Sequence, residues 1–303
     1  MSKNPNKINL RPAEQQRLKL TKTQQKRIKA LYERAAREVA EQAKRAPRVP
    51  SDRLKKYYLK QLQTQLNDAL AKIQTEMDTT VRESMRDTAS AVIEDNLAFL
   101  KKVGMPLGLA FAHVPDDIVR TVATGQLYQG KWSLSSAIWK HIRKNQKDIQ
   151  TIIAQGIAQN KSAYEIAKDL EKYVDPAAKK DWNWSKVYPG ISKKVDYNAQ
   201  RLSRTMISHA YQQAFIQATQ KNPFITKYQW ISAGDKRTCP ICEARDGNYY
   251  AKDELPLDHP NGRCTVVAVI ENSYEEIADR IADWVQGEDD AALDAFASCL
   301  EGK

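Results

Sequence analysis

The sequence predicts a mainly α-helical protein with a small α+β unit near its C-terminus. Three observations support this fold class. Apolar residues recur at spacings of three and four through residues 51–103, which is the period of an amphipathic helix. The 303 residues include only 11 glycines and 12 prolines, too few for a turn-rich all-β fold. A run of mostly β-branched residues at 263–270 indicates a strand.

The first half of the chain is expected to form long helices. Residues 1–50 predict a basic helical arm, which ends at Pro47 and Pro50 because proline resists helical geometry. Residues 51–110 predict a long amphipathic helical region, in which 87–90 is a place for a break. Its apolar stripe needs a partner surface, supplied by another helix of this chain or by another subunit as a coiled coil.

The remaining residues divide into three further segments. Residues 111–222 predict a helical middle domain, with helices at 118–124, 136–157, 163–174 and 196–221 and a loop at 175–195. A capping box, Ser162 with Glu165, opens the helix at 163. Residues 223–272 predict a small β-rich Cys/His unit with strands at 227–232 and 263–270. Residues 273–303 predict an acidic helical tail with helices at 273–286 and 289–300.

Charge is distributed very unevenly along the chain. Residues 1–60 hold 18 basic and 5 acidic residues, whereas residues 271–303 hold 2 basic and 10 acidic ones. The basic arm suits a polyanion such as double-stranded DNA, bound without sequence reading. A lysine-rich solvated helix face explains the same pattern equally well. The residues expected to contact DNA are Arg17, Lys19, Lys22, Lys26, Arg27, Lys29, Arg34 and Arg37.

Four residues form a C-x2-C-x16-H-x4-C pattern, namely Cys239, Cys242, His259 and Cys264. Three thiolates and one imidazole suit a structural zinc ion, which would cross-link a unit with little core of its own. Reduced cysteines packed without metal remain an alternative. A thioredoxin-like redox role for Cys239 and Cys242 is disfavoured, because no βαβ pattern surrounds them. A catalytic cysteine activated by His259 is also disfavoured, because no residue is recognised that would orient the histidine as a base.

Several classes of protein are disfavoured by the sequence. No stretch approaches the roughly 18 apolar residues of a membrane helix, and the N-terminus shows no secretory signal. Three of the four cysteines fall within residues 239–264, unlike the spread framework of a disulfide-rich secreted chain. A reducing, intracellular place of synthesis is therefore expected, without membrane contact.

Several motifs occur in order within residues 201–264. They are Arg204-Thr205 on a helix that also holds His209, then Trp230, Asp235 and Thr238 before Cys239-Pro-Ile-Cys242, then Asp246-Gly247, and finally His259-Pro260 before Arg263-Cys264. This order resembles the phage Mu F-like head-morphogenesis family. Residues 124–162 look like the minor capsid members of long-tailed phages, so the resemblance covers about 115–270. Many relatives read His-Pro-x-Cys-Arg-Cys, whereas Gly262 stands here at the first of those cysteines.

The resemblance implies a low-copy, non-enzymatic minor head protein of a tailed bacteriophage. Such a protein would join the procapsid, meet portal, major capsid and scaffold proteins, and influence DNA packaging or ejection. Its place would be the virion head. The alternative function is a zinc-supported nuclease or another DNA-processing enzyme. Against it, no second histidine or paired carboxylate accompanies His259, and Asp235, Asp246, Asp253 and Asp258 are interpreted as scattered turn formers.

Overall fold

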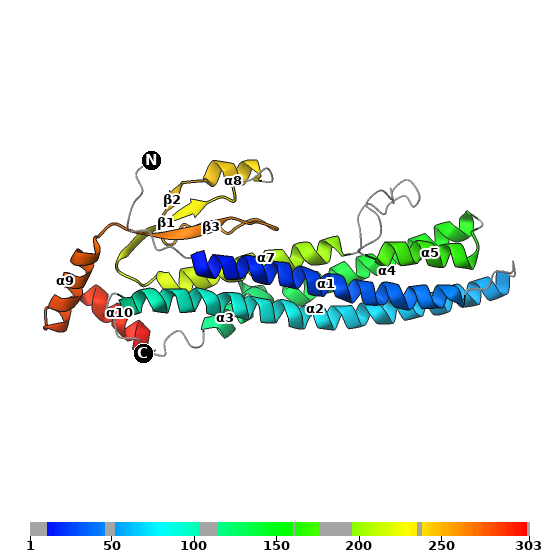
Figure 1. The fold of residues 1–303 in the computed structure, drawn as a ribbon, viewed down its shortest axis with the longest axis horizontal. Coiled ribbons are helices and arrows are strands. Elements are labelled where there is room, and N and C mark those ends of the chain that lie inside the picture. The colour runs from blue at the N-terminus through cyan, green and yellow to red at the C-terminus, as the bar shows by residue number, and fades with distance from the viewer. Residues whose placement is uncertain are drawn as a thin grey trace. The chain divides into compact units, whose positions relative to one another are not determined.

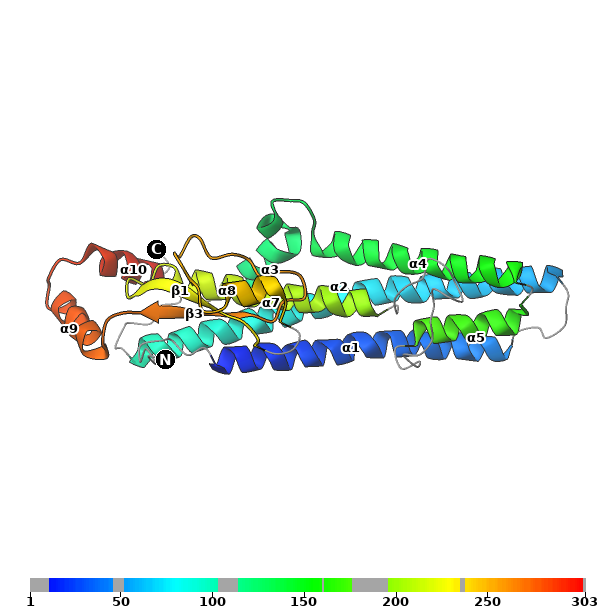
Figure 2. The same cartoon turned by 90° about the horizontal axis from the view of Figure 1, so that it is seen from above.

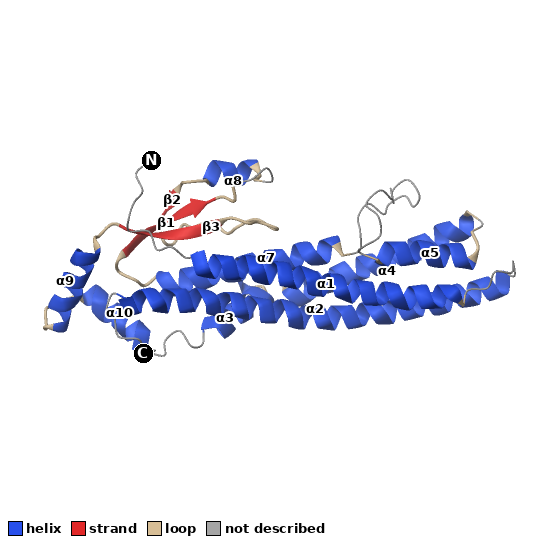
Figure 3. Cartoon of the chain, viewed as in Figure 1, coloured by secondary structure: helices blue, strands red, loops and turns tan. Residues whose placement is uncertain are grey.

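The computed structural model describes residues 11–45, 52–102, 114–159, 161–175, 196–234 and 238–301. Helices make up most of this part of the chain, and its strands form one small antiparallel sheet between residues 225 and 270 (Figure 3). The Cys/His cluster lies close to that sheet in sequence. The predicted fold class is therefore confirmed.

Two long helices form the N-terminal part, α1 (Arg11–Lys44) and α2 (Asp52–Lys102). The predicted break at 87–90 is wrong, because α2 continues through it. Thr88 donates its hydroxyl hydrogen to the carbonyl of Ser84 at 2.7 Å, and Ala89 is fully buried. Internal hydrogen bonding and packing thus keep this segment helical. The predicted interruptions at 46–50 and 104–108 lie outside the described residues.

The middle of the chain is helical, as expected. Its elements are α3 (Val114–Thr124), the short 3-10 turn η1 (Gln126–Tyr128), α4 (Leu134–Ala158), α5 (Ala163–Val174) and α7 (Tyr197–Thr219). The capping box of Ser162 and Glu165 is present at the start of α5, so this helix begins where its sequence predicts. The loop expected at 175–195 lies, after residue 175, outside the described residues.

The chain divides into two compact units built from interleaved segments. Unit 1 comprises Met1–Thr21, Arg82–Gln129 and Arg204–Lys303, and unit 2 comprises Lys22–Val81 and Gly130–Ser203. Each unit therefore joins segments that are far apart in sequence, whereas the sequence pattern suggested five consecutive segments. The helices α1, α2 and α7 each contribute residues to both units.

Unit 2 is a helical assembly in which parts of α1, α2, α4 and α5 run side by side (Figures 1 and 2). Its core is aliphatic, with Ile28 of α1, Leu62 and Leu66 of α2, and Ile142 and Ile149 of α4 all almost fully buried. The apolar stripes recognised in the sequence thus find partners within the chain.

A buried polar network crosses the core of unit 2. Tyr32 Oη lies 2.8 Å from His141 Nε2, and Tyr173 Oη donates to Asp148 at 2.8 Å. Asn145 lies between them, 3.3 Å from the His141 ring and 3.4 Å from Tyr32 Oη. Burial, reinforced by the charge of a nearby lysine, lowers the pKa of His141 to about 4. The ring is therefore neutral at pH 7.

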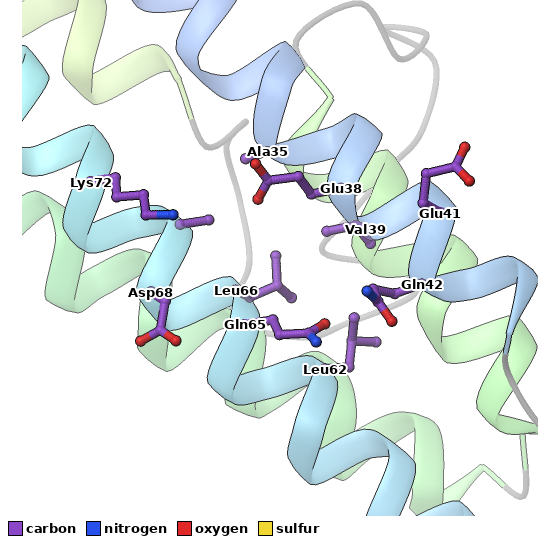
Figure 4. A pocket seen from close by; sticks show the side chains of 11 residues that line it. Ala35, Glu38, Val39, Glu41, Gln42, Leu62, Gln65, Leu66, Asp68 and Lys72 are labelled. Atoms are coloured by element: carbon purple, nitrogen blue, oxygen red, sulfur yellow. The ribbon is translucent and has the colours of Figure 1, made fainter.

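A groove of about 380 Å³ lies between α1 and α2 within unit 2 (Figure 4). The side chains of Val39, Leu62 and Leu66 line it, while the carboxylates of Glu41 and Asp68 point away from it in Figure 4. A ligand site needs a few polar groups that converge on one point. The lining also contains Glu38, Gln42, Gln65 and Lys72, so the groove mixes apolar and polar side chains. We assign it no ligand.

Unit 1 contains the sheet, formed by β1 (Ile225–Ile231), β2 (Tyr249–Tyr250) and β3 (Thr265–Ile270) in the order β2-β1-β3. Both pairings are antiparallel. Tyr228 fixes β1 on α7, because its ring lies 5.2 Å from that of Phe215 and its hydroxyl lies 2.9 Å from that of Thr219. The two predicted strands are confirmed, and β2 is an addition.

The acidic tail forms α9 (Tyr274–Val285) and α10 (Ala291–Glu301). A capping box of Ser273 and Glu276 opens α9, and Arg280 holds Asp290 through a 2.6 Å ion pair. Among the described residues, no helix is both long enough and apolar enough to cross a membrane.

Candidate metal centre

Two of the predicted ligands are placed by a short helix, α8 (Pro240–Arg245). Cys239 is its N-cap residue and Pro240 occupies the first turn, where proline is preferred because no backbone donor is lost. The Cys239 sulfur accepts a hydrogen bond from the backbone N–H of Cys242 at 3.5 Å. The Cys-x-x-Cys spacing therefore turns both sulfurs toward the same side of α8.

His259 reaches this pair from the loop that precedes β3. Its Nε2 atom lies 3.3 Å from the Cys239 sulfur and 3.1 Å from the Cys242 sulfur. Its Nδ1 atom lies 3.0 Å from the carbonyl oxygen of Pro260, which can only accept. Nδ1 therefore carries the hydrogen, and the lone pair of Nε2 faces the two sulfurs. A backbone carbonyl orients many metal-binding histidines in this way.

These distances fit a zinc ion. With Zn–S bonds of about 2.3 Å and a Zn–N bond of about 2.0 Å, a sulfur and a nitrogen in one tetrahedron are roughly 3.5 Å apart. The two S–N distances of 3.3 and 3.1 Å need only a small expansion to reach that value. Cys239, Cys242 and His259 thus have the spacing of three corners of a tetrahedral metal site.

The fourth predicted ligand, Cys264, lies on the other side of Cys242. Cys242, Asp258 and Cys264 form a second group whose ligand atoms all lie within 4.8 Å of one another. Cys242 belongs to both groups, so the four predicted ligands fall into two overlapping groups that share this residue. Sequence analysis missed Asp258, which was interpreted as a turn former and is in fact buried in the cluster.

The electrostatics of the cluster distinguish its members. The backbone hydrogen bond from Cys242 is the main cause that lowers the pKa of Cys239, to about 7. Burial, followed by the neighbouring thiols, raises the pKa of Cys242. Burial also raises the pKa of Asp258, whereas the positive charges of Arg17 and Arg245 act in the opposite direction. Cys239 is therefore the most readily ionised thiol of this pair.

Helix α7 holds the ligand loop in place. Gln212 accepts from the backbone N–H of Asp258 at 2.9 Å and donates to the carbonyl of Pro256 at 2.6 Å. His209 Nε2 lies 2.9 Å from the carbonyl of Asp258, and Ser208 donates to the carbonyl of Gly262 at 3.1 Å. His209 is buried and its pKa is lowered by that burial. Its position is that of a support for the loop.

Arg17 belongs to the same support. Its guanidinium is 2% exposed and donates to Ser208 Oγ at 3.0 Å and to the carbonyl of Arg263 at 3.4 Å. It also lies 5.1 Å from the centre of the Tyr211 ring. A buried guanidinium cannot reach a phosphate from solvent. We therefore remove Arg17 from the set of residues expected to contact DNA.

The other predicted DNA contacts are exposed on α1, namely Lys19, Lys22, Lys26, Arg27, Lys29, Arg34 and Arg37. Within unit 2, Lys22, Lys26, Lys29 and Arg37 follow helical spacing along one face. Lys29 forms an ion pair with Glu33, and Arg34 forms one with Glu76. The exposed face of α1 is thus cationic, as its sequence suggested.

A second cationic stripe, on α4, was overlooked in the sequence. Lys140, Arg143, Lys144 and Lys147 recur at helical spacing and are all exposed. Beside them Trp139 is 49% exposed, with the Arg143 guanidinium 4.5 Å from its ring centre. An exposed aromatic beside basic residues is a feature of nucleic-acid-binding surfaces. The signal was present in the sequence as four basic residues within 140–147.

The comparison with family models agrees with the motifs. Residues 147–267 match the family described as Phage Mu protein F like protein. This segment includes all four predicted metal ligands and Asp258, whereas residues 115–146, which also looked familiar in sequence, lie outside the match. Neither the curated proteins nor the solved structures gave a match. The segment that carries the candidate metal centre is therefore similar to phage Mu F-like proteins.

Proposed function

We propose that this protein is a head-morphogenesis (minor head) protein of a tailed bacteriophage. The observation that carries the proposal is the family match over residues 147–267, which includes the Cys/His cluster. In this role the protein joins the procapsid in the host cytoplasm, associates with the portal, and remains in the virion head. It contributes to DNA packaging or ejection by contact rather than by catalysis.

The partners that fit this role are the portal, major capsid and scaffold proteins. The acidic helices α9 and α10 suit a basic protein surface, because most of their acidic side chains are exposed. Tyr274 is 57% exposed and Val285 71% exposed at the two ends of α9, which adds apolar contacts to that charge.

Deletion of the gene tests the assembly role directly. We expect particles that lack the protein to lose infectivity, and complementation with the wild-type gene to restore it. Purified protein should co-sediment with procapsids that contain portal, and less with procapsids that lack it. Normal infectivity of the deletion phage would refute the proposed function.

We propose that the exposed stripe of α1 contacts DNA without reading sequence. Binding of this kind weakens with salt, and log K falls against log salt with a slope of about −0.9 per phosphate neutralised. A variant in which Gln replaces three of these cations should show a slope that is smaller by up to about 3. The three are Lys22, Lys26 and Arg37. The matched control replaces Lys56, Lys60 and Lys72, which are exposed on α2. Equal losses in both variants would mean that only net charge matters.

We further propose that zinc is the structural metal of the cluster. Cys239, Cys242, His259 and Cys264 are the ligands that sequence and spacing favour, and the S–N distances support three of them. Bound zinc would couple metal affinity to folding of this unit. The purified protein should contain about one zinc ion per chain, and a chelator should lower the thermal stability of the protein. Cys239→Ser should lower zinc content and stability together.

A nuclease role finds little support in the site. The Nδ1 atom of His259 is hydrogen-bonded to the Pro260 carbonyl, and its Nε2 atom faces the two sulfurs. Neither ring nitrogen is therefore placed to act on a substrate. Incubation of plasmid DNA with the protein and divalent metal tests this point. Cleavage that disappears in His259→Ala would favour the enzymatic alternative.

A further inference from the structure

Asp258 is an unusual acidic residue in this unit. Its side chain is 5% exposed, and one carboxylate oxygen accepts from the backbone N–H of His259 at 2.9 Å. The other oxygen, Oδ2, is buried and meets no hydrogen-bond donor among the residues that the structure describes. An ionised carboxylate is costly to bury without a donor or a cation beside it. A cation bound beside this oxygen would give it a partner.

The free oxygen lies next to two sulfurs. Cys242, Asp258 and Cys264 have ligand atoms within 4.8 Å of one another, and all three residues are buried. Around a five-coordinate zinc with Zn–S of about 2.3 Å and Zn–O of about 2.1 Å, a neighbouring sulfur and oxygen are roughly 3.1–3.8 Å apart. A cation between these atoms would satisfy the carboxylate and the thiols together.

Gly262 makes room for this carboxylate. A Cβ atom at position 262 would overlap the carboxyl group of Asp258, so any residue larger than glycine must displace it. The carboxylate of Asp258 thus occupies the place into which a side chain at 262 would point. The missing side chain at 262 and the buried carboxylate at 258 are therefore two parts of one arrangement.

Positive charge nearby offsets the additional negative ligand. Arg17 donates to the carbonyl of Arg263 at 3.4 Å, and Arg245 donates to the carbonyl of Leu257 at 3.5 Å. Both guanidinium groups thus bind residues next to the ligand positions. A centre with three thiolates and a carboxylate carries more negative charge than one divalent cation neutralises, and two arginines reduce that excess.

We propose that the carboxylate of Asp258 is a ligand of the metal centre, in the space that Gly262 leaves open. The proposal rests on the zinc site of the proposed function and adds an oxygen to its three sulfurs and one nitrogen, which makes the metal five-coordinate. The first shell of the metal then contains two light-atom ligands, the oxygen of Asp258 and the nitrogen of His259. Without Asp258, the metal would have only one light-atom ligand, the nitrogen of His259.

X-ray absorption at the zinc edge of the full-length protein measures this difference. Zn–S distances near 2.3 Å are resolved from Zn–N and Zn–O distances of about 2.0–2.2 Å. We expect two light-atom ligands in the wild type and one in Asp258→Ala. A wild-type shell with a single light atom beside three or four sulfurs would overturn the proposal while leaving the zinc centre intact.

Metal affinity separates a ligand from a nearby supporting group. Loss of a supporting group costs about 10–100-fold in affinity, so loss of a ligand should exceed about 100-fold. Competition with a chromophoric chelator should show this loss for Asp258→Asn, which keeps the size of the side chain and an acceptor for the His259 N–H. Asp253→Asn, an exposed acid in the same loop, is the matched control. Similar affinities for these two variants would contradict the proposal.

A relocated ligand gives the most specific test. Gly262→Cys alone should weaken folding, because its Cβ meets the Asp258 carboxyl group. The double variant Asp258→Ala, Gly262→Cys replaces the oxygen by a sulfur at the same place. It should recover affinity relative to Asp258→Ala and gain one sulfur in its absorption spectrum. Failure to recover, in a protein shown by circular dichroism to be folded, would overturn the proposal. If the wild type binds no zinc, the metal centre itself fails.

Discussion

Arg17 provides a sharp test of the structure, because the charge pattern and the fold predict different outcomes for its removal. The charge pattern places Arg17 among the residues that contact DNA. The structure instead buries its guanidinium against Ser208, the carbonyl of Arg263 and the ring of Tyr211. Arg17→Ala should therefore destabilise unit 1 and leave DNA affinity unchanged.

The size of the effect follows from the interactions that the guanidinium makes. A hydrogen bond from a charged donor contributes about 1.5–3 kcal/mol, and a desolvated cation–π interaction contributes about 2 kcal/mol. Removal of one buried partner typically costs about 3–5 kcal/mol. Glu14, the ion-pair partner, is 28% exposed and is resolvated when Arg17 is replaced, so the lower end applies. We expect Arg17→Ala to lower the stability of unit 1 by about 3 kcal/mol. The backbone amides of this unit should then exchange their hydrogens with solvent roughly a hundredfold faster.

Hydrogen exchange followed by mass spectrometry measures this locally. Amides of α7 from residue 204 onward and of β3 should lose protection in Arg17→Ala, while α4 and α5 serve as the internal reference. Lys19→Ala is the matched control, since Lys19 is exposed two residues along the same helix. The structural role of Arg17 is refuted if both variants keep the same protection, or if only Arg17→Ala weakens DNA binding.

Three further predictions concern pH, thiol reactivity and packing. The pKa of His141 falls from 6.5 to about 4 on folding, so the unfolded chain takes up the proton first as pH falls. The free energy of unfolding in urea should therefore fall by about 2–3 kcal/mol as the pH is lowered from 6.5 to 4. The variant His141→Gln should lack this pH dependence. Cys239 should be alkylated with a half-maximal rate near pH 7, with Cys242 far slower, and added zinc should protect both; equal rates would contradict the assigned environments. Gly156→Ala should destabilise unit 2 by about 1–3 kcal/mol in urea unfolding, because the new Cβ would lie 2.7 Å from Ile166 Cγ1; unchanged stability would show that the Ile166 side chain can move aside.

Local sequence signals predicted the helices well. The box of Ser162 and Glu165 set the start of α5 because both hydrogen bonds form between residues three apart. The expected break at 87–90 failed for the opposite reason. Polar residues suggested a weak helix there, but the burial of Ala89 depends on packing that no local pattern contains. The strand β2 has only two residues, too few to show alternation.

The candidate site shows a similar limit. Cysteine and histidine spacing identified the cluster, because few other functions use that residue pattern. Asp258 could not be recognised in the same way, because its importance depends on the missing Cβ of Gly262 and on the burial of its free oxygen. Charge alone likewise could not distinguish buried Arg17 from the exposed cations that follow it on α1.

The first turns of the basic arm belong to the fold of unit 1. The backbone N–H of Ala13 donates to Asp95 at 2.7 Å, and Arg17 supports the loop that carries Gly262 and Cys264. Truncation of the arm would therefore disturb the metal centre and remove cations in one step, and its effect on DNA binding could not be assigned to either. Substitutions from Lys22 onward change the cationic face of unit 2 without touching these contacts. The contribution of the arm to DNA binding must accordingly be measured with point variants in the full chain.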